Sequence, residues 1–91
     1  MKVFVEIETH AYMDMYPSKN VNCLEEDKID LVINNIRNNW SGGTVNSYHI
    51  MTELEAAEYV DKMIAEEKAH WQYDSQEVIN NMIRLLEESY K

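Results

Sequence analysis

The segment spanning residues 51–77, MTELEAAEYVDKMIAEEKAHWQYDSQE, carries eight carboxylates and only two lysines. Carboxylates three or four residues apart on a helix rise about 4.5–6 Å along its axis, while successive phosphates on one DNA strand rise about 3.4 Å. A helix can therefore present negative charges at separations comparable to every second phosphate. The carboxylates that are candidates for such a partner-binding surface are Glu53, Glu55, Glu58, Asp61, Glu66 and Glu67.

The same carboxylates also fit an ordinary amphipathic helix with a solvated outer face. If the helix begins near Glu53, its apolar residues Leu54, Ala57, Val60 and Ile64 lie roughly on one side. Most of the carboxylates then fall away from that side and into water. The sequence leaves both interpretations open.

Two tyrosines close to these carboxylates, Tyr59 and Tyr73, are further candidates for partner binding. Tyrosine is enriched in protein interfaces because it supplies a large contact area at a low cost in entropy. The chain holds six tyrosines and two tryptophans, which are too many for complete burial in so small a core. Partial burial with the hydroxyl groups in water is the alternative.

Other chemistry finds little support in the residue pattern. Glu67 and His70 form one Glu-x-x-His pair, but a di-iron site needs a second pair and carboxylates from two more helices. Cys23 is the single cysteine, which excludes an intrachain disulfide and a multi-cysteine zinc site. The chain has no nucleophile elbow, phosphate loop or dinucleotide fingerprint. We therefore expect no catalytic residues, no metal and no cofactor, and we expect that the protein is not an enzyme.

The charge balance restricts the class of partner. Seventeen acidic and eight basic residues give a formal net charge of −9, which repels nucleic acid and anionic membranes and attracts basic protein surfaces. No stretch is long and apolar enough for a membrane span, and MKVFVEIETH is typical of a strand rather than a signal peptide. The 91 residues predict a single domain, residues 1–91, in the cytoplasm.

The first half of the chain predicts a strand and a helix. Alternation of Val3, Val5 and Ile7 with polar residues indicates a strand with one buried face, which can continue through residues 10–16. Residues 17–22 are expected to form a loop. Asn22 is expected to cap a helix with Glu25 as the reciprocal partner. The apolar stripe of this helix is Leu24, Ile29, Val32, Ile33, Ile36 and Trp40.

The second half predicts one strand and two helices. Gly42 and Gly43 are expected to end the first helix in left-handed conformations, and residues 44–51 form a strand whose buried face is ambiguous. Capping boxes are expected at Thr52 with Glu55 and at Asp74 with Glu77. The resulting class is α+β, with a small two- or three-stranded sheet and about three helices packed on one face.

These features resemble a class of proteins, the small acidic α+β inhibitors encoded by phages, which include anti-CRISPR and anti-restriction proteins. The resemblance is carried by the size, the net charge of −9, the acidic segment TELEAAEYVDKMIAEE and the scattered aromatic residues. It implies an inhibitor that blocks the basic nucleic-acid-binding site of a host defence enzyme, such as a CRISPR nuclease, in the host cytoplasm. It implies no direct binding of nucleic acid or membrane.

Two other functions fit the same residues. The first is a structural or regulatory protein-interaction module without nucleic-acid mimicry, which can be a homodimer packed through its terminal helices. The second is a small-ligand binder that uses Tyr48, His49 and neighbouring aromatic residues. The oligomeric state stays open.

Overall fold

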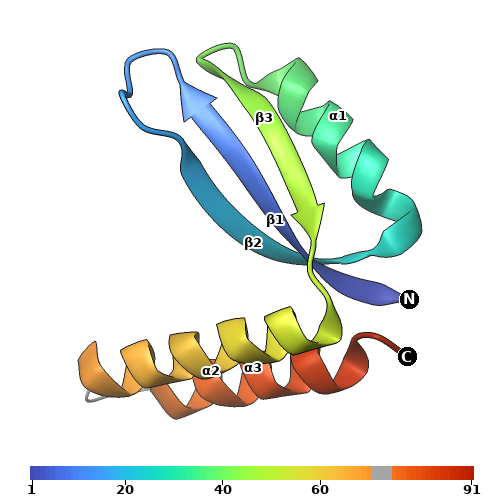
Figure 1. The fold of residues 1–91 in the computed structure, drawn as a ribbon, viewed down its shortest axis with the longest axis vertical. Coiled ribbons are helices and arrows are strands. Elements are labelled where there is room, and N and C mark those ends of the chain that lie inside the picture. The colour runs from blue at the N-terminus through green and yellow to red at the C-terminus, as the bar shows by residue number, and fades with distance from the viewer. Residues whose placement is uncertain (71–74) are drawn as a thin grey trace.

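The alternating strand at the N-terminus becomes the centre of the sheet. The computed structural model describes residues 1–70 and 75–91, which form a three-stranded antiparallel sheet and three α-helices (Figure 1). Strand β1, Lys2–Ala11, lies between β2, Ser18–Glu25, and β3, Gly43–Ile50. Val3, Val5 and Ile7 are almost fully buried on one face of β1, as predicted, but Phe4 is also buried on the opposite face.

The helices are divided between the two faces of the sheet. Helix α1, Ile29–Asn39, places Ile29 and Ile33 against Val3, Val5 and Ile7. Helices α2, Glu53–His70, and α3, Ser75–Glu88, run side by side at the end of the sheet that lies near both termini (Figure 1).

Together these two helices cover Phe4, through residues that include Ala56, Val60, Met82 and Leu86. The predicted α+β class is confirmed. The expectation that all helices would pack on one face is wrong, because β1 carries apolar side chains on both faces and each face needs its own cover.

The segment between β1 and the first helix differs most from the sequence-based expectation. Residues 12–17 form a turn, and of the predicted loop at residues 17–22 only Pro17 lies in it, since residues 18–22 begin β2. Asn22 pairs with Val5 across the sheet, so it caps no helix, and Leu24 and Cys23 also lie on β2. A 3₁₀ turn, Glu26–Lys28, leads from β2 into α1.

Strand β3 is confirmed, and an irregularity in its pairing explains why its buried face was ambiguous. Thr9 lies opposite Val45 while Glu8 lies opposite Ser47, so Asn46 is an extra residue on β3. This bulge shifts the alternation by one position. Val45, Tyr48 and Ile50 therefore share a face of the sheet, although simple alternation places Val45 opposite the other two.

The glycines before β3 serve a different purpose from the one predicted. Neither Gly42 nor Gly43, both within the described residues, has a positive φ angle. A Cβ atom on Gly43 would instead lie 2.5 Å from the Trp40 ring and 2.6 Å from the carbonyl oxygen of His10. Gly43 is thus required by the close approach of the Trp40 side chain and the β1 backbone.

Candidate protein-binding surface

Some carboxylates of helix α2 are exposed to solvent, and others are hydrogen-bonded or half-buried within the fold. Ala56 and Val60 are buried against the sheet and α3, which fixes the opposite side of the helix as the outer one. Glu53, at the first turn, and three later carboxylates are exposed. We define the α2 outer face as the three later carboxylates together with the exposed lysine between them: Glu58, Asp61, Lys62 and Glu66.

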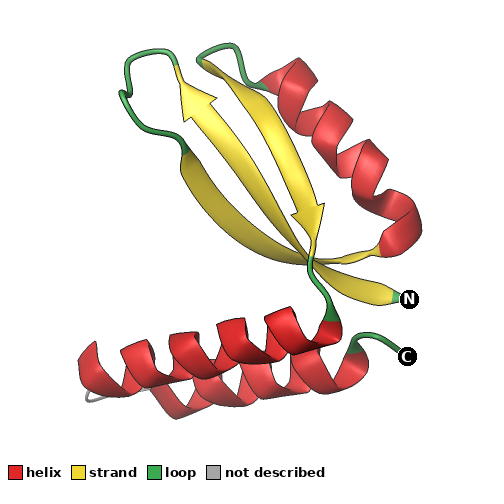
Figure 2. Cartoon of the chain, viewed as in Figure 1, coloured by secondary structure: helices red, strands yellow, loops and turns green. Residues whose placement is uncertain are grey.

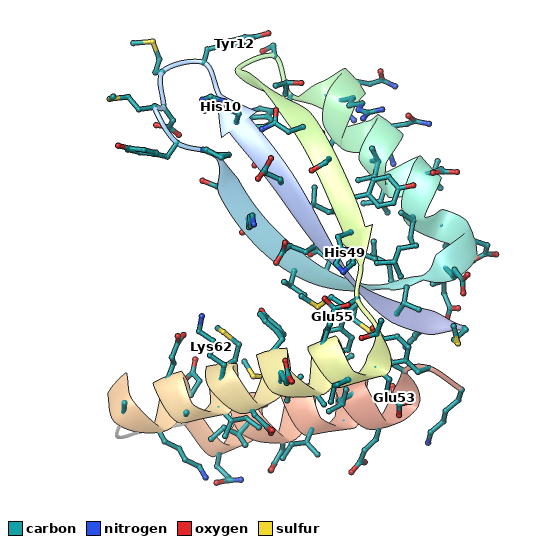
Figure 3. The ribbon with its side chains drawn as sticks, viewed as in Figure 1. His10, Tyr12, His49, Glu53, Glu55 and Lys62 are labelled. Atoms are coloured by element: carbon teal, nitrogen blue, oxygen red, sulfur yellow. The ribbon has the colours of Figure 1, made fainter. Side chains whose placement is uncertain are left out.

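Glu55 is held by the start of its own helix. Its Oε1 accepts the Thr52 backbone N–H at 3.0 Å, and the Glu55 N–H donates to Thr52 Oγ1 at 3.2 Å, so the predicted capping box is confirmed. His49 on β3 points at the same carboxylate (Figure 3), and its Nε2–H donates to both oxygens at 3.1 Å. These hydrogen bonds, the Thr52 N–H first and His49 second, lower the pKa of Glu55. A carboxylate satisfied in this way is poorly suited to bind a partner.

The cap gives a pH-dependent prediction. The pKa of Glu55 is lower in the folded protein than in the unfolded chain. The ionised Glu55 side chain therefore stabilises the fold above its usual pKa, and this stabilisation is lost as the pH falls through the pKa of the folded protein. Glu55→Gln is therefore expected to destabilise the protein at pH 7 and to have a smaller effect near pH 2–3. Urea denaturation at several pH values measures both.

A matched variant tests the other half of the same cap. Thr52→Ala removes the hydroxyl acceptor and is expected to cost about 1 kcal/mol of unfolding free energy. Because neither threonine nor alanine titrates, this substitution neither adds nor removes an ionisable side chain. An effect of Glu55→Gln that stays constant from pH 7 to pH 2 contradicts the assigned hydrogen bonds.

The tyrosine of this helix belongs to the core rather than to the surface. The Tyr59 ring meets the Phe4 ring edge to face, with centroids 6.3 Å apart, and packs against the buried cluster around Phe4. Burial raises the pKa of Tyr59, and the negative charge of Glu66 raises it further. Tyr59→Ala would therefore damage the fold before it tested any partner contact. Tyr73 and the predicted cap at Asp74 lie outside the described residues.

The remaining carboxylate of the predicted set, Glu67, is half-buried and lies on the inner half of the helix. Lys68 is exposed, as is Lys62, so two cations stand among the exposed acids. The six predicted carboxylates therefore do not form one continuous row. Glu58 and Asp61 are separated by about 4.5 Å along the axis, and Asp61 and Glu66 by about 7.5 Å.

A second exposed feature was missed by the sequence interpretation. The turn of residues 12–17, which we call the hairpin tip, exposes four large apolar side chains: Tyr12, Met13, Met15 and Tyr16. Their pattern resembled a continuation of β1. Asp14 and Pro17 were the available signals for a turn, because both residue types favour turns.

The other residue types that could perform chemistry, a cysteine and possible metal ligands, form no reactive site among the described side chains. Cys23 lies on β2, and its Sγ is 3.3 Å from Ser89 Oγ, which in turn donates to the Leu85 carbonyl at 2.6 Å. Within residues 1–69 and 76–91, whose side chains the structure describes, no three His, Cys, Asp or Glu side chains converge as a metal site would require. None of the described helices has an apolar run long enough to cross a membrane.

Comparison with protein-family models, with curated proteins and with solved structures found no match to this chain.

Proposed function

We propose that this protein acts by binding another protein, and that the α2 outer face occupies a basic surface on that partner. The observation that carries the proposal is the exposure of Glu58, Asp61 and Glu66 on one helix of a chain with a net charge of −9. A basic nucleic-acid-binding site of a host defence enzyme, such as a CRISPR nuclease, is the partner surface that this charge fits. Occupying that site would inhibit the enzyme in the host cytoplasm.

The physical basis is electrostatic complementarity. An acidic surface is steered towards a basic groove, and it competes there with nucleic acid for the same lysines and arginines. Because Glu55 is bound in its cap and Lys62 lies among the carboxylates, the helix is better described as a patch of separate negative charges than as a copy of a phosphate backbone. The proposal therefore needs a basic partner but no exact match of spacing.

A second function is favoured by the hairpin tip. Four exposed apolar side chains in one turn are typical of a contact between proteins. A regulatory or structural interaction module that binds through this turn would need no nucleic-acid-binding partner. The two functions predict different partners and different sensitivity to salt.

Matched baits separate the two functions. The α2 triple variant, Glu58→Gln, Asp61→Asn and Glu66→Gln, removes three exposed charges without adding bulk. The control triple variant, Glu26→Gln, Asp27→Asn and Asp30→Asn, removes three exposed charges from the 3₁₀ turn and α1. We expect the wild-type and control baits to retain one basic nucleic-acid-binding protein from an extract of the host cells, and the α2 triple bait to retain little of it.

The retained protein should elute as salt rises, since exposed charges are screened over about 8–10 Å near physiological ionic strength. Three outcomes count against the proposal: equal retention by all three baits, retention of a partner that binds no nucleic acid, and retention of no protein at all.

A further inference from the structure

The hairpin tip combines unusual exposure with an ordered backbone. Tyr12, Met13, Met15 and Tyr16 are between 75% and 95% exposed. Their summed apolar surface is on the order of 500 Å², which is comparable to the largest apolar patch on a typical monomeric protein. Such patches are frequently sites of interaction, because leaving them in water has a cost that binding removes.

Hydrogen bonds hold the first half of the tip, residues 12–14, in place without a partner. The Tyr12 N–H donates to the Gly42 carbonyl at 3.0 Å, and the Asp14 N–H donates to the Ala11 carbonyl at 3.1 Å. The His10 Nε2–H donates to the Asp14 carbonyl at 2.6 Å. The backbone of residues 12–14 is therefore tied to β1 and to the loop before β3, while the four apolar side chains are exposed to solvent. A preorganised loop loses less conformational entropy on binding than a flexible one.

The tip lies far from the α2 outer face. The turn between β1 and β2 and the loop between α1 and β3 stand at one end of the sheet, and the α2–α3 pair stands at the other (Figure 2). His10 and Tyr12 mark the first end, and Glu55 and Lys62 mark the second (Figure 3). The tip is thus a separate surface from the α2 outer face, and a partner pocket for it rests on the second proposed function, binding through this turn.

The negative charge of this protein restricts the kind of partner surface that could cover the tip. Asp14 lies in the middle of its apolar side chains, and the whole chain carries −9. An anionic membrane would repel this charge, and so would a second copy of the same chain. An apolar pocket with lysines or arginines at its rim complements both the apolar side chains of the tip and the negative charge of Asp14. We propose that the hairpin tip inserts into an apolar, basic-rimmed pocket of a partner protein.

A photo-crosslinking experiment tests this proposal and identifies the partner in the same step. A photo-activatable methionine analogue is placed at position 13 of the full chain, and at position 54 as a control, since Leu54 is also exposed but lies on α2. We expect illumination in host-cell extract to join position 13 to one peptide that holds apolar residues beside lysine or arginine. Position 54 should not give this product.

Two variants show whether the apolar side chains are responsible. Tyr12→Ser with Tyr16→Ser should reduce binding to the cross-linked partner about 30-fold or more, as loss of a hot spot does, and should leave the melting temperature nearly unchanged. Leu31→Ser, which changes another exposed apolar residue, should reduce it less than 3-fold. Because these positions lie outside α2, the result is independent of the α2 triple variant.

Three other results overturn the proposal. The first is a cross-link from position 13 only to a second copy of the chain, together with dimers in size-exclusion chromatography. The second is binding to vesicles of phosphatidylcholine, with or without phosphatidylserine, that Tyr12→Ser and Tyr16→Ser abolish. The third is the absence of any product that distinguishes position 13 from position 54.

Discussion

Replacing Tyr90 by alanine is expected to cost about 3–5 kcal/mol of unfolding free energy, a large share of the roughly 5–15 kcal/mol that stabilises a typical domain. The Tyr90 ring stacks on Phe4 with centroids 6.5 Å apart, and it packs against both core clusters. Its backbone N–H donates to the Lys2 carbonyl at 2.9 Å. The residue thus joins the end of the chain to β1 and closes the contact between the sheet and the α2–α3 pair.

The hydroxyl group of Tyr90 contributes separately. It accepts the Phe4 N–H at 3.0 Å and donates to the Met51 carbonyl at 2.8 Å, and so bridges these two groups beside the direct hydrogen bond from the Met51 N–H to the Phe4 carbonyl at 2.9 Å. Tyr90→Phe keeps the ring and leaves both groups without this partner, which is expected to cost about 1–3 kcal/mol. The backbone of Tyr90 has a φ of 63°, an uncommon conformation for a non-glycine residue, and these contacts offset its strain.

Chemical denaturation of the purified protein measures both effects. Tyr16→Phe is the matched control, because it removes the same hydroxyl from an exposed ring and should change stability by less than about 0.5 kcal/mol. If Tyr90→Phe behaved like Tyr16→Phe, the bridge between Phe4 and Met51 would not contribute to stability.

The α2 triple variant is expected to weaken binding to the basic partner about 3-fold to 150-fold. Each exposed ion pair contributes about 0.2–1 kcal/mol, so the loss of Glu58, Asp61 and Glu66 removes about 0.6–3 kcal/mol. The effect should appear mainly in the association rate and should shrink as salt rises, because the charges act through solvent. Surface plasmon resonance at several salt concentrations gives the rates.

The control triple variant changes the net charge by the same amount but leaves α2 intact. It should weaken binding by only a small factor, which reports the long-range field of the whole chain. Equal losses in the two triple variants would mean that net charge alone drives the association. An α2 triple variant that binds like the wild type would remove the α2 outer face from the interface.

Local patterns predicted the elements that local forces determine. The alternation of Val3, Val5 and Ile7 identified β1, and the Thr52–Glu55 pair identified the start of α2, because each signal acts over a few residues. Strand β2 was missed because its first residues are polar and it lies at an edge of the sheet. Pairing with β1 decides its structure, and that pairing is a tertiary interaction that no local pattern contains.

The candidate site shows the same division. The exposure of Glu58, Asp61 and Glu66 follows from helix periodicity, and the structure agrees. Glu55 had two predicted roles, in the cap and on the surface, and its hydrogen bonds favour the cap. The role of Tyr59 depends on its contact with Phe4, which is 55 positions away in sequence. The hairpin tip depends on where β2 begins, so it could not be located without that pairing.

A competition assay tests the proposed function most directly. The partner retained by the wild-type bait is bound to its own labelled nucleic acid, and increasing amounts of this protein are added. We expect complete displacement of the nucleic acid by the wild type, and displacement by the α2 triple variant only at about 3-fold to 150-fold higher concentration. A ternary complex in which the partner holds the nucleic acid and this protein together would contradict the proposal.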